Sequence, residues 1–336
     1  RSRSYVCAPR MGGSARARDF IGFYREWGEE WSMKILLTGS TGMIGKAILA
    51  QLPKKHQVVE VSREKGIDIT QKGAMANAMK GVNVVIHTAA SLDEMAGKEE
   101  MQKVNVEGTQ NVLDAAEKEG VKKFIHVSSV SVFGDRKQGV LKEESPQFPE
   151  STNEKTKAEA ERRVSEMQEV FPVVIIRPAL VVGPNKYWAS IFKIVKKGFP
   201  LIGEGNNKWQ MVDVDDVAGL IVKAVDEEKM EGNTYIAAER TGHTLREVVD
   251  MIADIQGVKR PGNIPRWAGM VISHVFGLKS MLTGKKSILI PGHVRRMFKH
   301  REYDISAALS TGWKPQYDTK QALEKTYRLL KEEGHI

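Results

Sequence analysis

The chain has 336 residues, of which 41% are hydrophobic and 28% are charged, and its formal net charge is +9. These proportions are those of globular proteins and exclude the disordered and fibrous classes. No apolar run reaches the roughly 20 residues of a membrane-spanning helix, and no signal-peptide pattern opens the chain, so we expect a cytoplasmic protein. The single cysteine, Cys7, leaves the rest of the chain without disulfide, thiolate-metal or cysteine-nucleophile chemistry.

Residues 1–32 are expected to form an N-terminal extension outside the fold. The sequence starts with Arg1, and five arginines precede the first acidic residue, Asp19. This composition fits an arginine-rich, acid-poor transit peptide, and it also fits a tag or translated upstream sequence ahead of a start at Met33. We expect no functional residue in this segment.

From Met33 onward, short apolar runs alternate with amphipathic stretches, which is the pattern of a parallel sheet covered by helices. The predicted strands are residues 34–38, 57–62, 82–88, 123–128 and 173–177. The predicted helices between them are residues 44–52, 73–79, 100–119 and 156–169. We therefore predict an α/β fold with a doubly wound parallel sheet.

The first predicted strand leads directly into a glycine-rich turn, after which an apolar-periodic helix begins. The turn reads Thr38-Gly39-Ser40-Thr41-Gly42-Met43-Ile44-Gly45. Gly39 permits the tight turn, Gly42 lets backbone N–H groups approach a pyrophosphate, and Gly45 lets the helix pack closely on the sheet. With the helix N-terminus facing the anion, the sequence predicts a dinucleotide site on a Rossmann-type domain, and Thr41, Met43 and Ile44 belong to it.

The end of the second predicted strand indicates which dinucleotide is bound, because an Asp or Glu there would bind the ribose diol of NAD. Ser62 and Arg63 stand at this place instead. Arg63 can pair bidentately with a 2′-phosphate, and Ser62 can donate a hydrogen bond to it. We therefore predict NADP. NAD is the alternative if Arg63 is a solvated loop residue and Glu60 is the acid that binds the ribose diol.

Past Pro184, glycine and proline residues interrupt the alternating pattern, and further helices are predicted at residues 245–255, 267–276 and 320–333. We expect residues 33–182 to form the NADP-binding domain, with residues 210–238 returning to it. Residues 183–209 and 239–336 are expected to form a smaller, discontinuous C-terminal substrate lobe.

Two features of this lobe bear on its partners. The stretch from Trp267 to Leu282 is apolar on more than one face, which favours a buried helix and makes an apolar or lipid-like substrate a second hypothesis. Residues 258–301 hold ten Lys or Arg residues and no Asp or Glu. This basic segment is either a solvated face or a site for an anionic substrate or a membrane surface, and it lacks the interleaved aromatic residues of a nucleic-acid reader.

Further motifs follow the glycine turn in chain order. They are Asp68-Ile69-Thr70, Val85-Ile86-His87-Thr88-Ala89-Ala90-Ser91, Asn105-Val106-Glu107-Gly108-Thr109, Ser128-Ser129-Val130-Ser131-Val132-Phe133-Gly134, Arg177-Pro178-Ala179-Leu180-Val181-Val182-Gly183-Pro184, Asp213-Val214-Asp215-Asp216-Val217-Ala218 and Gly312-Trp313-Lys314-Pro315. With this set, nearly the whole chain from Met33 resembles the extended short-chain dehydrogenase/reductases, the family of nucleotide-sugar epimerases, dihydroflavonol reductases and 3β-hydroxysteroid dehydrogenases.

The resemblance implies further cofactor contacts. Asp68 and Ile69 would flank the adenine, Ala89, Ala90 and Ser91 would line the cofactor ribose, and the segment from Pro178 to Val181 would touch the nicotinamide. Taken from the residues alone, Asp68 is equally compatible with a helix cap, and Asn105 with an ordinary buried polar residue.

The resemblance also implies a catalytic serine or threonine that orients the carbonyl and a tyrosine that exchanges a proton with the substrate oxygen. It implies as well a lysine, four residues after the tyrosine, that stabilises the phenolate and holds the cofactor ribose. Ser129 matches the serine, and Lys157 matches the lysine at the start of its helix, but Asn153 stands in the tyrosine position. A carboxamide can hydrogen-bond a substrate oxygen but cannot donate a proton near neutral pH. No tyrosine lies between Tyr24 and Tyr187, so Tyr187 is the nearby candidate for a substitute donor, and packing is its alternative role.

The remaining polar clusters have structural explanations. We expect the two strand histidines, His87 and His126, to be structural, and we expect no metal site, because His293 and His300 lack ligand partners at suitable spacing. The acidic group Asp213, Asp215 and Asp216 is explained by a helix N-cap.

The sequence leaves three functions open. The first is an NADP(H)-dependent oxidoreductase of the extended short-chain type, acting on a small carbonyl or alcohol substrate, apolar or anionic. In it Ser129 and Lys157 have their family roles, and the proton donor is unassigned. The second is a non-catalytic NADP(H)-binding sensor or structural subunit, which Asn153 motivates. The third is a nucleotide-sugar epimerase or dehydratase. A homodimer and peripheral membrane contact are compatible with all three.

Overall fold

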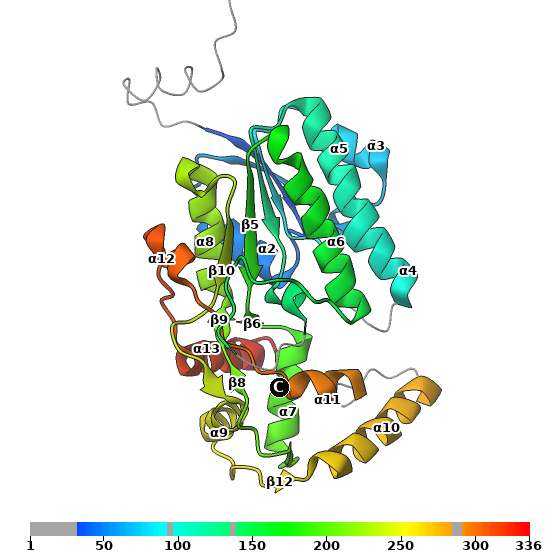
Figure 1. Cartoon of the computed structure of the whole chain (residues 1–336), viewed down its shortest axis with the longest axis vertical. Helices are drawn as coiled ribbons and strands as arrows, with labels where there is room; N and C mark the ends of the chain where they lie inside the picture. The colour runs from blue at the N-terminus through cyan, green and yellow to red at the C-terminus, as the bar shows by residue number, and fades with distance from the viewer. Residues whose placement is uncertain (1–31, 93–96, 135–138, 284–290) are drawn as a thin grey trace, which may run out of the picture.

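The computed structural model describes residues 32–92, 97–134, 139–283 and 291–336, so most of the N-terminal extension lies outside the described residues (Figure 1). Its central sheet has six parallel strands in the order β10-β5-β4-β3-β1-β2. These strands are β1 Lys34–Thr38, β2 Gln57–Val61, β3 Val84–His87, β4 Lys123–Val127, β5 Val173–Pro178 and β10 Thr234–Ala237. The predicted parallel sheet is confirmed, and β10 is a strand that the sequence pattern did not predict.

Helices cover both faces of this sheet (Figure 1). On one face lie α2 Met43–Gln51 and α8 Val214–Asp226, and on the other lie α3 Lys72–Ala78, α5 Thr109–Glu119 and α6 Thr152–Glu166. Because side chains alternate along a strand, Ile35 and Leu37 of β1 enter one hydrophobic core and Leu36 enters the other. The doubly wound α/β prediction is therefore confirmed.

Two helices differ from their predicted form. The single helix predicted for residues 100–119 consists of α4 Gly97–Gln102, a π-helical segment Lys103–Gly108, and α5. Helix α6 begins at Thr152 instead of residue 156, because Ser151 and Glu154 form a capping box in which each side chain bonds the other's backbone N–H. Lys157 consequently lies in the second turn of α6 rather than at its start.

A third hydrophobic core lies beyond the carboxyl ends of the strands (Figure 1). It is built by α7 Lys186–Lys196, α9 Leu245–Gln256 and α13 Thr319–Glu332, with the short strands β7 Leu201–Ile202 and β8 Lys208–Trp209. Tyr303, Ile305 and Trp313, which lie between α9 and α13 in the chain, belong to the first core instead. The segment between α9 and α13 therefore packs against the sheet and connects this region to it.

The remaining elements are short, with one exception. They are β6 Leu180–Val182, β9 Met211–Asp213, β11 His243–Thr244, β12 Asn263–Ile264, α11 Pro291–Met297, α12 Ser306–Ser310 and the 3₁₀ turns Arg63–Lys65, Val130–Phe133, Met167–Glu169 and Glu228–Met230. The exception is α10, Arg266–Thr283, which projects from the molecule (Figure 1). The expectation of a buried helix here is wrong, since several of its large apolar residues are exposed.

Candidate functional site

The glycine turn after β1 has the geometry that a phosphate-binding turn requires. Gly39 has φ +71°, and a Cβ on it would lie 2.6 Å from Thr88 Oγ1, so only glycine fits there. A Cβ on Gly45 would overlap the carbonyl oxygen of Gly39. Gly42 precedes α2 without a side-chain cap, and the first turn of α2 holds no acidic residue. The N-terminal N–H groups of α2 are therefore suited to bind an anion.

The turn faces a second loop across the point where the strand order reverses. The neighbours β1 and β3 are followed by α2 and α5, which lie on opposite faces of the sheet. This is the switch point outside whose carboxyl strand ends doubly wound folds have their ligand-binding crevice. The Thr88 hydroxyl donates to the carbonyl of Thr38 at 2.7 Å, and the N–H of Ala89 donates to Thr38 Oγ1 at 3.2 Å. Ala89 thus stands directly beside the glycine turn, and Ala90 follows it in the chain.

Asn105 holds the far end of this loop. Its Oδ1 accepts from the N–H of Ser91 at 2.6 Å, and its Nδ2 donates to the Ser91 carbonyl and to Thr156 Oγ1, each at 3.0 Å. Asn105 is 1% exposed and lies in the π-helical segment. Its amide therefore holds Ser91 in place relative to α6. Asn105 thus has a specific positioning role, beyond that of an ordinary buried polar residue.

The adenine-side candidates lie after β2 and before α3. Asp68 Oδ1 accepts from the N–H of Thr70 at 2.9 Å, and the residue that caps α3 is Gln71, so Asp68 is not the cap of that helix. Ile69 is buried, and its carbonyl accepts from Asn111 Nδ2 at 3.0 Å. Asp68 stabilises the turn that presents Ile69.

The residues proposed to distinguish NADP from NAD lie in the short 3₁₀ turn after β2. Ser62 Oγ accepts from the N–H of Lys65 at 3.2 Å, which leaves its own hydroxyl hydrogen available. The Arg63 side chain is 71% exposed and forms a 3.7 Å ion pair with Glu100. Glu60, the alternative ribose ligand, pairs with Lys65 at 3.4 Å.

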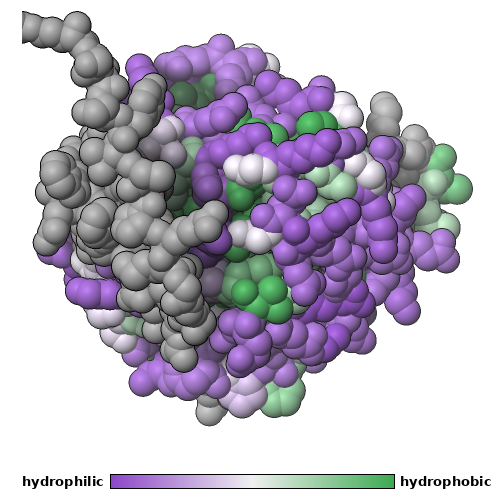
Figure 2. All heavy atoms as spheres, turned by 90° about the horizontal axis from the view of Figure 1, so that it is seen from above, coloured by the Kyte–Doolittle hydropathy of each residue, from purple (hydrophilic) through white to green (hydrophobic). Residues whose placement is uncertain are grey.

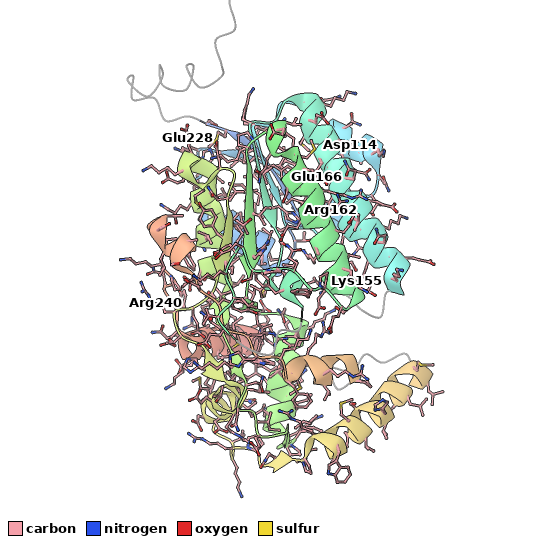
Figure 3. The ribbon with its side chains drawn as sticks, in the orientation of Figure 1. Asp114, Lys155, Arg162, Glu166, Glu228 and Arg240 are labelled. Atoms are coloured by element: carbon pink, nitrogen blue, oxygen red, sulfur yellow. The ribbon has the colours of Figure 1, made fainter. Side chains whose placement is uncertain are left out.

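Lys157 is buried at the carboxyl end of β4. Its Nζ donates to the carbonyl of Val127 at 3.3 Å, two residues before Ser129. Burial lowers the pKa of Lys157 to about 8, against the opposing charge of Glu161. Lys155, Arg162 and Glu166 mark the solvent face of α6, so the helix presents Lys157 and Glu161 inward (Figure 3).

Ser129 follows β4, and Asn153 precedes Lys157 on α6. Ser129 caps the 3₁₀ turn after β4, and its Oγ accepts from the N–H of Ser131 at 3.1 Å. Asn153 lies one turn before Lys157 on α6, and its Oδ1 is buried with no hydrogen-bond partner among the described residues. The same holds for the hydroxyl oxygens of Ser40, Ser128 and Ser131.

Two features of the glycine turn and the start of α2 fit a nicotinamide dinucleotide. The N-terminal N–H groups of α2 have neither a side-chain cap nor an acidic residue in the first turn, so they can receive a pyrophosphate. Gly39 and Gly45 lie where a Cβ would overlap neighbouring atoms, so the turn keeps its backbone free of side chains.

Two histidines fill the sheet beneath the crevice. His87 bonds Thr38 Oγ1 through Nδ1 at 2.7 Å and Thr109 Oγ1 through Nε2 at 2.9 Å, and His126 stacks on it with ring centroids 5.5 Å apart. Burial, reinforced by the charge of Lys157, lowers the pKa of His87 to about 3 and the pKa of His126 well below its usual value. Both rings are neutral, and His87 has the structural role that the sequence predicted.

In the acidic group at the start of α8, Asp213 has the expected capping role. Asp213 Oδ1 accepts from the N–H of Asp215 at 2.8 Å, and Lys325 pairs with both carboxylates. Asp216 accepts from the N–H groups of Gln316 and Tyr317. In the described part of the chain, no group of three or more His, Cys, Asp or Glu side chains is arranged to hold a metal ion.

The nicotinamide-side candidates lie after β5. Pro178 is the last residue of β5, and Val181 lies in β6, where its carbonyl accepts from Trp188 Nε1 at 2.8 Å. Tyr187 is 37% exposed, and burial of its hydroxyl raises its pKa, against the opposing charges of Arg301 and Arg296. The structure describes no contact between Tyr187 and Lys157.

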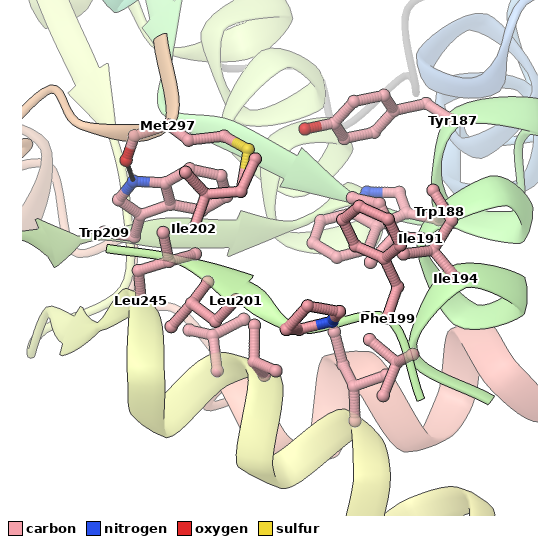
Figure 4. A pocket seen from close by; sticks show the side chains of 15 residues that line it. Tyr187, Trp188, Ile191, Ile194, Phe199, Leu201, Ile202, Trp209, Leu245 and Met297 are labelled. Carbon is pink, nitrogen blue, oxygen red and sulfur yellow. Dashed lines mark hydrogen bonds between the residues drawn. The ribbon is translucent and has the colours of Figure 1, made fainter. Parts of the chain in front are cut away.

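An apolar cavity of about 100 Å³ lies in the third core (Figure 4). Its walls come from α7, β7 and α9, and Tyr187, Trp209 and Met297 lie at its margin. Figure 4 shows the Tyr187 side chain directed over the cavity toward the side where Met297 lies. The sequence did not predict this cavity, because its walls come from segments far apart in the chain.

The structure also corrects the interpretation of the basic segment as one solvated face. Lys299 forms a 3.1 Å ion pair with Glu154, and their side chains are only 11% and 4% exposed. Arg301 lies over the ring of Trp209, with 5.1 Å to the ring centroid. Part of the basic segment is therefore internal, and Lys299 ties the third core to the start of α6, next to Asn153.

Comparisons with known proteins agree with this geometry. A family model described as the NAD dependent epimerase/dehydratase family matches residues 35–238. The UDP-glucose 4-epimerase of Vibrio cholerae is 30% identical over 321 residues, which cover 87% of this chain and 94% of the relative.

Two solved structures share the fold. The UDP-glucuronic acid 4-epimerase of Bacillus cereus, in complex with UDP-glucuronic acid and NAD, has a TM-score of 0.72 at 22% identity and covers 90% of this chain and 100% of its own. RMD from Pseudomonas aeruginosa, complexed with NADPH, has a TM-score of 0.69 at 19% identity and covers 88% of this chain and 98% of its own.

Proposed function

Since the chain belongs to the NAD dependent epimerase/dehydratase family of extended short-chain dehydrogenase/reductases, we propose that it is an NADP(H)-dependent oxidoreductase acting on a carbonyl or alcohol substrate. The observation that carries this proposal is Lys157, a buried amine with a pKa of about 8 at the carboxyl end of β4. An amine of this pKa can exchange a proton with a substrate near neutral pH, which the amide of Asn153 cannot do.

The residues of the crevice have distinct roles in this proposal. When bound, the nicotinamide supplies or accepts the hydride. As the carbonyl is reduced, Lys157 gives a proton from Nζ to the substrate oxygen and recovers one from solvent. The Ser129 hydroxyl and the Asn153 amide orient that oxygen by hydrogen bonds. The turn formed by Gly39, Gly42 and Gly45 brings the N-terminal N–H groups of α2 to the pyrophosphate.

We assign the two parts of the chain as the sequence predicted. Residues 33–182 and 210–238 bind the cofactor, and residues 183–209 and 239–336 bind the substrate. The apolar cavity of the third core supports a substrate with an apolar portion, because it offers hydrocarbon walls and few polar atoms.

Arg63 is proposed to select NADP. Its ion pair with Glu100 is exposed and therefore contributes little free energy. Arg63 can give up Glu100 and pair with a 2′-phosphate at small cost in free energy. Arg63→Ala is expected to weaken NADPH binding about tenfold and to leave NADH binding unchanged, because it removes one charged contact. Fluorescence titration of both cofactors measures this. Lys65→Ala is the matched control, and equal affinity of the natural protein for both cofactors would refute the selection of NADP.

The test of the function is a carbonyl-substrate screen that follows NADPH oxidation, run with the natural protein and with Asn153→Tyr. We expect turnover by the natural protein, with a pH profile that changes in the Tyr variant because a second proton donor is added. If the natural protein shows none and the Tyr variant gains activity, the protein is instead a non-catalytic NADP(H)-binding protein.

The similarity to a UDP-glucose 4-epimerase over 94% of that relative favours a second candidate function, a nucleotide-sugar epimerase. An epimerase regenerates its cofactor in each cycle, so it would interconvert UDP-sugars with no net change in NADPH. Chromatography of UDP-sugars after incubation with the protein separates the two candidates. Interconversion of a UDP-sugar without net oxidation would replace the oxidoreductase proposal.

A further inference from the structure

Helix α10 carries a continuous apolar stripe on its outer side. Residues 267, 271, 275, 278 and 282 follow one another at spacings of four, four, three and four, which places them on one face of a helix. They are Trp267, Val271, Val275, Leu278 and Leu282, and they are 58% to 78% exposed. Met281 beside them is 83% exposed.

The inner side of the same helix makes its closest contacts through small residues, and Met270 and Ile272 are half-buried beside them. Gly269 is pressed against Ile202, where a Cβ would overlap the isoleucine side chain, and Gly277 faces Pro291 of α11. Ser273 between them is fully buried, and its hydroxyl donates to the Met270 carbonyl at 2.7 Å. An ordinary surface helix packs its large apolar face inward, so α10 has the reverse arrangement. Its close contact with the protein is made without the stripe, which is left for another partner.

The position of α10 gives that partner access. The helix leaves the body at β12 and projects outward, and hydrophobic side chains gather at the right edge of the molecule over its far end (Figures 1 and 2). No helix in the described ranges is long and apolar enough to cross a membrane. A partner that covers this stripe therefore lies along the length of α10.

The charge around α10 indicates which partner this is. Residues 258–301 hold ten Lys or Arg residues and no acidic residue, and they keep a net positive charge although Arg260 pairs with Asp254 and Lys299 pairs with Glu154. Among the described ones, Lys259 and Arg295 are exposed. Two copies of the chain that met through this stripe would bring two such segments together, which like-charge repulsion opposes. A bilayer with anionic headgroups has the complementary charge and accepts the apolar residues as well.

We propose that α10 lies in the interface of an anionic lipid bilayer, with its apolar stripe among the acyl chains and the surrounding basic residues against the headgroups. Trp267, at one end of the stripe, is a residue type that membrane interfaces favour. Ile202, on which α10 packs, also lines the apolar cavity, so this docking brings the cavity close to the bilayer.

The test is co-sedimentation of the full chain with vesicles of phosphatidylcholine alone and of phosphatidylcholine mixed with phosphatidylglycerol. We expect binding to the mixed vesicles that weakens as salt rises, and about tenfold weaker binding for Val271→Gln/Val275→Gln, because less apolar surface enters the interface. Val140→Gln/Val170→Gln is the matched control, since Val140 and Val170 are 52% and 51% exposed elsewhere on the protein.

Three results would overturn the proposal. The first is no binding of the natural protein to either vesicle, and the second is an equal loss of binding in the control variant. The third is a dimer in light scattering that Val271→Gln/Val275→Gln dissociates, without vesicle binding, which would make the stripe a contact between copies. Cofactor titration reports on the nucleotide site separately, because none of these four valines lies in it.

Discussion

Lys157→Met is expected to lower turnover by about 10²- to 10⁴-fold, the range that general acid help contributes. Methionine keeps most of the side-chain volume, so the packing of α6 on β4 is retained while the proton and the charge are lost. Lys157→Arg separates two roles of the lysine. The guanidinium keeps the charge near the cofactor ribose but does not release a proton at neutral pH. We expect the arginine variant to bind NADPH and to turn over as slowly as the methionine variant.

The pH dependence of kcat/KM tests the role of Lys157 in a second way. The pKa of Lys157 is lowered to about 8, and reduction of a carbonyl needs its protonated form. The rate constant kcat/KM for reduction is therefore expected to fall as pH rises through about 8, and that for oxidation is expected to rise over the same range. An arginine variant with full kcat, or a flat profile from pH 7 to 9, would contradict the assignment of Lys157 as proton donor.

Much of the sheet could be predicted because local patterns determine it. Each predicted strand is a short apolar run, and a buried parallel strand needs little else. The start of α6 was missed, although Ser151 and Glu154 have the spacing of a capping box. Helix α7 was missed although Trp188, Phe192 and Val195 repeat at helical spacing, because the glycine and proline before it suggested irregular structure.

Features that depend on contacts between distant segments could not be predicted. The ion pair of Lys299 with Glu154 joins residues 145 positions apart. The clamp of Asn105 on Ser91 depends on a π-helical segment, for which the sequence has no local signal. In α10 the apolar pattern predicted a helix but wrongly favoured a buried one, because the pattern cannot say which face meets the protein. That is decided by the contact of Gly269 with Ile202.

The second large effect is expected from Glu161, one turn after Lys157. Its carboxylate accepts two hydrogen bonds from Arg177, at 3.0 and 2.6 Å, and the two side chains are 4% and 7% exposed. Glu161→Gln would leave the Arg177 charge buried without its counter-charge, which is expected to lower the free energy of unfolding by about 3–5 kcal/mol. Glu166→Gln on the same helix breaks an exposed pair with Arg162 and is expected to change stability by less than about 1 kcal/mol.

Chemical denaturation of the two glutamine variants, and of Glu161→Gln/Arg177→Met, measures this difference. The double variant removes both buried charges, so it should recover most of the lost stability. Glu161 also opposes the lowering of the Lys157 pKa. Its loss is therefore expected to move the fall in kcat/KM to lower pH, an effect that a purely structural ion pair would not have. Equal stability of Glu161→Gln and Glu166→Gln would contradict the expected loss of stability. An unmoved pH profile would show that this ion pair does not act on Lys157.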